Sequence, residues 1–182
     1  MSELFSIQLQ NRQQQGRDGI WLDLPTTTEQ VQAALRQIGI SSDNPQGLFI
    51  SGYFAEEEKR FAIPYNMVLA SNVDELNFLA SRLETLSTGE CAELNAALQV
   101  PQSELSSIGR ITDFPENVDY YVHLPDVRGP AQLGDYYLNR SGMVDMPEEW
   151  KGGIDTAQFG RYVTQQEQGA FTQYGYLVKS GD

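Results

Sequence analysis

Carboxylates are the only side chains suited to catalysis or to charge-based binding that this sequence supplies in abundance. It contains 25 acidic residues, 12 basic residues and one histidine, for a formal net charge of −13. Ten of the acids fall in residues 67–127, against only Arg82 and Arg110. Asp and Glu accept charge-assisted hydrogen bonds from arginine much as phosphates do. Placed three or four residues apart on helices, they stand about 5–6 Å apart on a rigid body, which could occupy a basic groove in place of DNA.

The other residue types offer little catalytic chemistry. His123 has no nucleophile elbow of the G-x-S-x-G kind to serve, so we interpret it as a structural histidine beside tyrosines. Cys91 lies on the apolar stripe of an expected helix, which is typical of a small core residue. The sequence shows no metal-ligand spacing and no phosphate-binding glycine loop, so it predicts neither a metal nor a cofactor. We expect a protein that is not an enzyme; a hydrolase that uses two carboxylates is the enzymatic alternative.

Composition and charge restrict the compartment and the partners. Hydrophobic residues are 40% of the 182 residues, enough for a core, and no apolar run reaches the roughly eighteen residues of a membrane span. One cysteine and a start without a basic or apolar signal region favour the reducing cytoplasm. A polyanion repels DNA, RNA and anionic membranes, so we expect basic proteins as partners and no direct nucleic-acid binding. The basic residues that leave nucleic-acid binding open are Lys59-Arg60 and those after residue 127.

Apolar periodicity predicts a small antiparallel sheet with one helix in residues 1–66. The alternating apolar residues of Leu4–Leu9 have the period of a half-buried strand, and the runs Ile20–Leu24 and Leu48–Phe54 complete three strands. Between the second and third, Thr26–Glu29 offers a capping box for a helix.

The remainder predicts antiparallel helices in residues 67–127 and a mixed α/β end in residues 128–182. Asn72 can cap a helix over Val73–Leu86, Ser87 begins a second helix, and a shorter one runs from Ser103. In the last third, the expected elements are a helix from Pro130 to Gly142, a helix between Asp155 and Gly169, and strand-like Phe171–Lys179. The fold class is therefore α+β, with a sheet-plus-helix domain, an acidic helical domain and a mixed domain.

Four segments resemble the ArdA family of antirestriction proteins, which conjugative elements and phages carry. They are Gly19–Leu24, Asp74–Leu83, Leu133–Tyr137 and Phe171–Tyr176, in the family's order, and Glu75-Leu76-Asn77-Phe78-Leu79-Ala80 is the most specific stretch. The resemblance implies an elongated protein of three small domains, often dimeric, that mimics DNA. Its target would be a type I restriction-modification enzyme. Some anti-CRISPR proteins of gut bacteria also look like ArdA, and their target would be a type II CRISPR nuclease with basic channels.

The sequence supports the two targets about equally, with a slight preference for the nuclease. With either target, the chain would be a stoichiometric inhibitor of a DNA-binding defence enzyme. The predicted partner-binding residues are Asp74, Glu75, Glu84, Glu90, Glu93, Asp113, Glu116, Asp119, Asp126 and Asp135. A generic acidic module that binds many basic proteins is the alternative. We expect the tyrosines at 120, 121, 136 and 137 to be core or half-buried packing residues rather than interface anchors.

Overall fold

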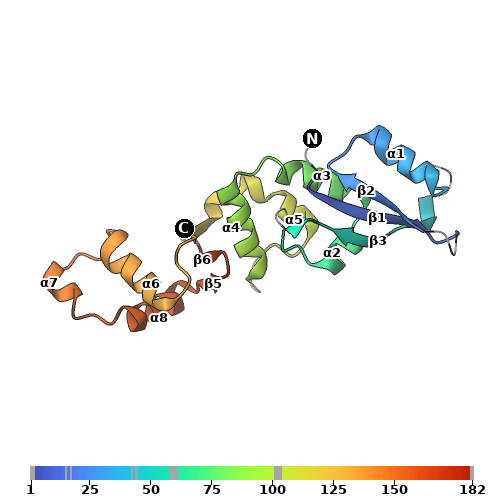
Figure 1. Cartoon of the computed structure of the whole chain (residues 1–182). Helices are drawn as coiled ribbons and strands as arrows, with labels where there is room; N and C mark the ends of the chain where they lie inside the picture. Colours follow the sequence, from blue (N-terminus) through green and yellow to red (C-terminus); the bar gives the residue numbers. More distant parts are fainter. Residues whose placement is uncertain are drawn as a thin grey trace. The chain divides into compact units, whose positions relative to one another are not determined.

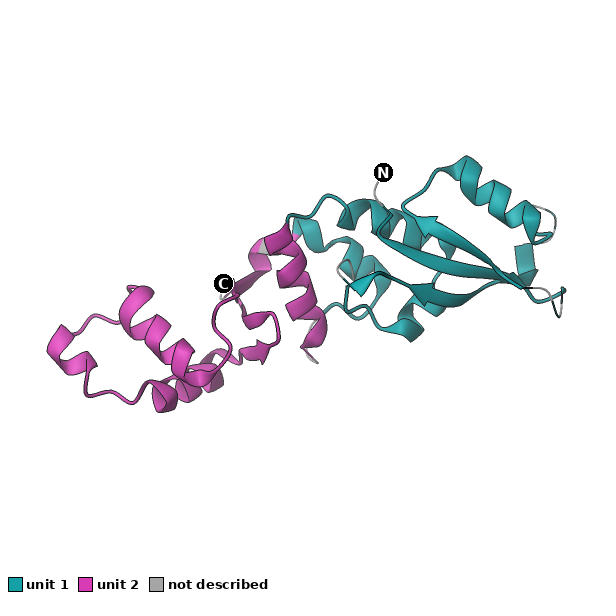
Figure 2. Cartoon of the chain, in the orientation of Figure 1, with its two compact units in different colours: residues 1–87, 104–116 teal, residues 88–103, 117–182 magenta. Residues whose placement is uncertain are grey.

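The structure, a computed structural model, divides into two compact units (Figure 2). Unit 1 comprises residues 1–87 and 104–116, and unit 2 comprises residues 88–103 and 117–182. The three domains predicted from the sequence, residues 1–66, 67–127 and 128–182, do not coincide with these units, and the division into three domains stays a prediction. The residues described are 3–14, 16, 18–41, 43, 45–57, 61–100 and 104–180. The pair Lys59-Arg60 lies outside them.

Unit 1 is built on a three-stranded antiparallel sheet with strand order β2-β1-β3 (Figure 1). The strands are β1 (Phe5–Asn11), β2 (Ile20–Leu24) and β3 (Leu48–Phe54), as apolar alternation predicts. Every second residue of β1 is buried, and Ile7 lies opposite Leu22 of β2. The sheet therefore has one core face and one outer face.

Helix α1 (Thr28–Gln37) lies over the core face of this sheet and buries Val31 and Ala34. Thr27 is its N-cap, because the Thr27 hydroxyl accepts a hydrogen bond from the amide of Gln30. The helix thus begins one residue later than a capping box starting at Thr26 would place it.

Unit 1 is completed by short helices around α3. Helix α3 packs against β2 and α5 and ends three residues earlier than predicted. The helix predicted from Ser103, which lies outside the described residues, begins later, because the Ser107 hydroxyl accepts a hydrogen bond from the amide of Arg110 and caps α5. The bounds are η1 Pro45–Gly47, α2 Tyr65–Leu69, α3 Val73–Leu83, α5 Ile108–Thr112 and η3 Phe114–Glu116.

Unit 2 holds a second three-stranded antiparallel sheet, with strand order β4-β6-β5. Its core includes Val127, Leu133, Tyr176 and Val178. Strand β4 lies in the segment predicted to be all-helical, so that prediction was wrong at this point. The bounds are α4 Thr88–Gln99, η4 Val118–Tyr120, β4 Tyr121–Leu124, α6 Pro130–Asp135, the π-helical η5 Tyr136–Arg140, α7 Glu148–Lys151, α8 Thr156–Glu167, β5 Ala170–Thr172 and β6 Gly175–Lys179.

Helices α6 and α8 lie side by side with their backbones in direct contact (Figure 1). A Cβ atom on Gly134 would lie 1.9 Å from the carbonyl oxygen of Thr156, and one on Gly160 would lie 1.8 Å from that of Pro130. The Asp155 carboxylate caps α8, as predicted, by accepting from two amides of its first turn. Together the two sheets and their helices confirm the α+β class. Among the described residues, no helix is long and apolar enough to cross a membrane.

Candidate acidic binding surface

The ten predicted binding acids are divided between the two units, so each unit carries an acidic set of its own. Side chains of six are exposed, and those of Glu75, Glu90, Glu93 and Asp135 are partly buried. The unit 1 set is Asp74, Glu75, Glu84, Asp113 and Glu116; the unit 2 set is Glu90, Glu93, Asp119, Asp126 and Asp135.

Helix α3 carries the acids of unit 1 that are best placed to meet a partner. Asp74 is exposed, and within the described part of the chain its carboxylate makes no hydrogen bond or ion pair. Glu84 is exposed at the other end of the helix. Glu75 is committed to the fold, because its Oε2 accepts a hydrogen bond from the Ser71 hydroxyl at 2.6 Å while its amide donates to Asn72 Oδ1 at 2.9 Å. Asp74 and Glu84 are therefore the main anionic positions of α3.

Two other predicted acids are held by basic side chains of the same unit. Glu116 Oε1 lies 2.6 Å from Arg82 Nη2. Asp135 accepts hydrogen bonds from Asn139 at 2.8 Å and from Arg140 at 3.1 Å, and these bonds lower the pKa of the Asp135 carboxyl. At either carboxylate, a partner's arginine would have to compete with an existing pair. Exposed pairs are worth only about 0–1 kcal/mol, so such competition is feasible.

Glu93 is the predicted binding acid that the structure supports least, because its side chain is partly buried. Its Oε1 is buried and has no hydrogen-bond partner among the residues that the structure describes. Burial, and then the charges of Glu90 and Asp119, raise the pKa of Glu93 to about 7. Near neutral pH this carboxyl is only partly charged. The apolar stripe expected on α4 is not observed, because its buried residues are the consecutive Leu94, Asn95, Ala96 and Ala97.

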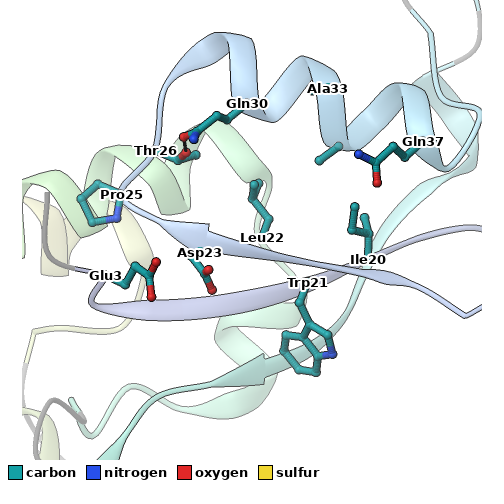
Figure 3. Close-up of a pocket in the computed structure, with 11 residues that line it drawn as sticks. Glu3, Ile20, Trp21, Leu22, Asp23, Pro25, Thr26, Gln30, Ala33 and Gln37 are labelled. Carbon is teal, nitrogen blue, oxygen red and sulfur yellow. Dashed lines mark hydrogen bonds between the residues drawn. The ribbon is translucent and has the colours of Figure 1, made fainter.

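A groove of about 520 Å³ lies between α1 and β2 on unit 1 (Figure 3). Leu22 points towards α1, whereas Trp21 points to the opposite face of the sheet (Figure 3). The ionisable residues that line the groove are Glu3 and Asp23, and the Ser6 hydroxyl donates a hydrogen bond to Asp23 at 2.5 Å. This lining offers no nucleophile paired with a base, and no group of metal-binding side chains occurs among the described residues. The exposed acids therefore stay the candidate site predicted from the sequence.

Comparison with protein families decides which class of binding protein this is. The family model for the antirestriction protein ArdA matches residues 15–178, nearly the whole chain. The chain belongs to the ArdA family. A search of curated proteins found no match. ArdA proteins are inhibitors of restriction rather than enzymes, which agrees with the anionic surface.

His123 and Cys91, the residues of this ArdA protein that were considered for catalysis, have contacts and burial typical of structural residues. His123 Nε2 donates a hydrogen bond to the carbonyl of Tyr174 at 2.7 Å and so ties β4 to the β5–β6 turn. Cys91 is half-buried, and burial followed by the charge of Glu90 raises the pKa of its thiol. A raised pKa disfavours the reactive thiolate. Of the tyrosines, Tyr120 is exposed and the other three are half-buried.

One residue of this ArdA protein was missed by sequence reasoning. Phe78 lies on α3 with 59% of its surface exposed, although it belongs to the most family-specific stretch. Helical spacing could have predicted the exposure of Phe78, because position 78 faces away from the apolar stripe of Leu76, Leu79 and Leu83.

Replacing Glu93 with glutamine is expected to stabilise this ArdA protein at pH 8 by about 1 kcal/mol and to change little at pH 5. Because the folded-state pKa is raised from 4.5 to about 7, the folded protein holds a proton that the unfolded chain loses in that window. The wild type therefore loses stability as the pH rises through the window, and glutamine cannot. Urea unfolding at both pH values measures the difference. An equal shift of the urea midpoint at pH 5 and pH 8 would contradict this origin.

Proposed function

We propose that this ArdA protein inhibits a type I restriction-modification enzyme by placing its acidic surface in the enzyme's DNA-binding groove. The observation that carries the proposal is the net charge of −13 in a member of an antirestriction family, with exposed acids on both units. Enzymes that grip duplex DNA line their grooves with lysine and arginine, because the duplex carries one negative charge per roughly 1.7 Å of axis. A folded polyanion competes for the same groove.

Helix α3 supplies the rigid part of such a mimic. Asp74 and Glu84 are ten positions apart in the sequence, which corresponds to roughly 15 Å along the helix axis, so the helix holds the two positions at a fixed separation. A rigid anion loses little conformational freedom on binding, unlike a disordered acidic tail. This surface works where restriction enzymes work, in the bacterial cytoplasm, and needs no cofactor.

A competition experiment tests the proposal. A purified type I methyltransferase complex is bound to fluorescent duplex DNA, and the protein is added while anisotropy is recorded; a type II CRISPR nuclease with guide is treated in parallel. We expect stoichiometric release of DNA from the type I complex, with inhibition that weakens as salt rises, because salt screens surface charge. Release from the nuclease alone would transfer the proposal to that target. Release from neither would overturn it.

Charge reversal on α3 is expected to weaken inhibition about 30-fold or more. The variant D74K/E75K/E84K replaces three attractive contacts of up to about 1 kcal/mol each by repulsive ones. The inhibition constant in the competition assay measures the loss. Because Glu75 also supports the start of α3, circular dichroism must show that the helix content is kept.

The matched control is D18K/D43K/E57K, which changes the net charge equally at exposed positions of unit 1 outside the predicted set. We expect it to retain inhibition within about threefold, as screened charges far from a contact act weakly. Equal losses in the two variants would mean that net charge, rather than the placement of acids on α3, sets the affinity.

A further inference from the structure

The fold accounts for the neighbours of Phe78 on α3, but it does not account for Phe78 itself. Leu76 and Leu79 are buried in the core. Asn77 Oδ1 accepts a hydrogen bond from the amide of Thr26 at 2.8 Å, and its Nδ2 donates to the carbonyl of the same residue at 3.0 Å, which fixes the link between β2 and α1. Phe78, between them in sequence, is 59% exposed. The core therefore does not require an aromatic ring at this position.

The surroundings of Phe78 on the outer face of α3 are polar and anionic. Helical spacing places Asp74 one turn before Phe78 and Arg82 one turn after it, with Cβ atoms about 5–6 Å apart. The Arg82 guanidinium is held by Glu116 at 2.6 Å. The carboxylate beside the ring that no described residue engages is that of Asp74.

An aromatic face beside an unengaged carboxylate is a receptor for a guanidinium group. The cation is attracted to the face of the ring, and its N–H groups donate to the carboxylate. The chain forms half of this arrangement internally, where the Arg12 guanidinium lies 5.2 Å from the centre of the Phe49 ring. A DNA phosphate has the wrong sign for such a receptor, whereas an arginine of a DNA-binding groove has the right one.

We propose that Phe78 is the aromatic anchor of the α3 surface, and that it stacks on an arginine of the inhibited enzyme while Asp74 pairs with the same guanidinium. This inference rests on the proposed function and adds a specificity element to it. A surface of carboxylates alone attracts any basic protein. A ring set among carboxylates favours arginine over lysine and places apolar area at the centre of a polar rim, where binding energy concentrates.

The test compares F78A, F78L and F78Y with wild type in the competition assay on the type I complex. We expect F78A to weaken inhibition at least 20-fold, F78L to recover only part of the loss, and F78Y to lie within threefold of wild type. The matched control is F54A. Phe54 is 56% exposed on the same unit, but it lies on strand β3, opposite Ser6 of β1, and not on α3. F54A is expected to inhibit within twofold of wild type, and thermal unfolding checks that each variant is folded.

The outcomes separate this inference from the proposed function. Inhibition by wild type together with equal inhibition by F78A would overturn the anchor and leave the function standing. F78L that matches wild type would overturn the guanidinium stack. Failure of wild type to inhibit would remove the function and the anchor with it. Binding of single-stranded DNA by wild type that F78A loses would show a base on the ring, and would also overturn the proposal.

Discussion

Replacing Gly160 with alanine is expected to destabilise unit 2 by about 3 kcal/mol or more. The added methyl carbon would lie 1.8 Å from the carbonyl oxygen of Pro130 and 3.0 Å from the amide nitrogen of Gly134. Both are backbone atoms of α6, so no side chain can rotate away, and the two helices must separate. Small proteins are stable by roughly 5–15 kcal/mol, so this loss is a large part of the total.

Urea unfolding followed by far-ultraviolet circular dichroism measures this loss. The matched control is Gly152→Ala, because Gly152 has a φ of −63° and, among the described residues, no tertiary neighbour within 4 Å of an added Cβ. Alanine there is expected to be neutral or stabilising by up to about 1 kcal/mol. A Gly160→Ala protein with the midpoint of wild type would show that α6 and α8 do not meet as described.

Replacing Glu167 with alanine is expected to cost about 3 kcal/mol or more, because one carboxylate joins three elements. Its Oε1 accepts a hydrogen bond from the Tyr137 hydroxyl of η5 at 2.5 Å, and its Oε2 accepts one from the Tyr176 hydroxyl of β6 at 3.0 Å. Hydrogen bonds to a charged group are worth about 1.5–3 kcal/mol each. Alanine would also leave the hydroxyl of Tyr176, a fully buried residue, without this acceptor.

Denaturant unfolding of Glu167→Ala, Tyr176→Phe and the double variant tests the assignment. The two changes are expected to be strongly non-additive, since either one removes the same hydrogen bond. Additive effects would contradict a direct interaction. Burial, and then the bond to Glu167, raise the pKa of both tyrosines, so unit 2 should also lose stability as the pH rises above about 10.

Local sequence signals predicted those parts of the fold that local chemistry builds. The alternation in β1 needs only its own residues, and the cap of α8 needs only Asp155 and the amides that follow it. Strand β4 gives no such signal, since its four residues gain strand geometry by pairing with β6, more than fifty residues later. The grouping of α4 with β6 depends on contacts that no periodicity encodes.

The candidate surface follows the same division. Exposure of Asp74 could be predicted, because helical spacing alone turns it away from the apolar stripe. The engagement of Glu116 could not, because Arg82 lies 34 residues earlier in the chain. The raised pKa of Glu93 depends on burial and on Asp119 of another element, which charge counting along the sequence cannot show.

The interleaving of the two units has a consequence for how the chain is made. Unit 1 requires residues 104–116, so it is incomplete on the ribosome until α4, a part of unit 2, has already been synthesised. The strand against which α4 packs, β6, begins only at Gly175. At synthesis rates of 5–20 residues per second, α4 waits roughly 4–15 s for that strand. During this interval Leu94, Ala96 and Ala97, which are buried in the folded chain, lack one of the elements that pack against their helix.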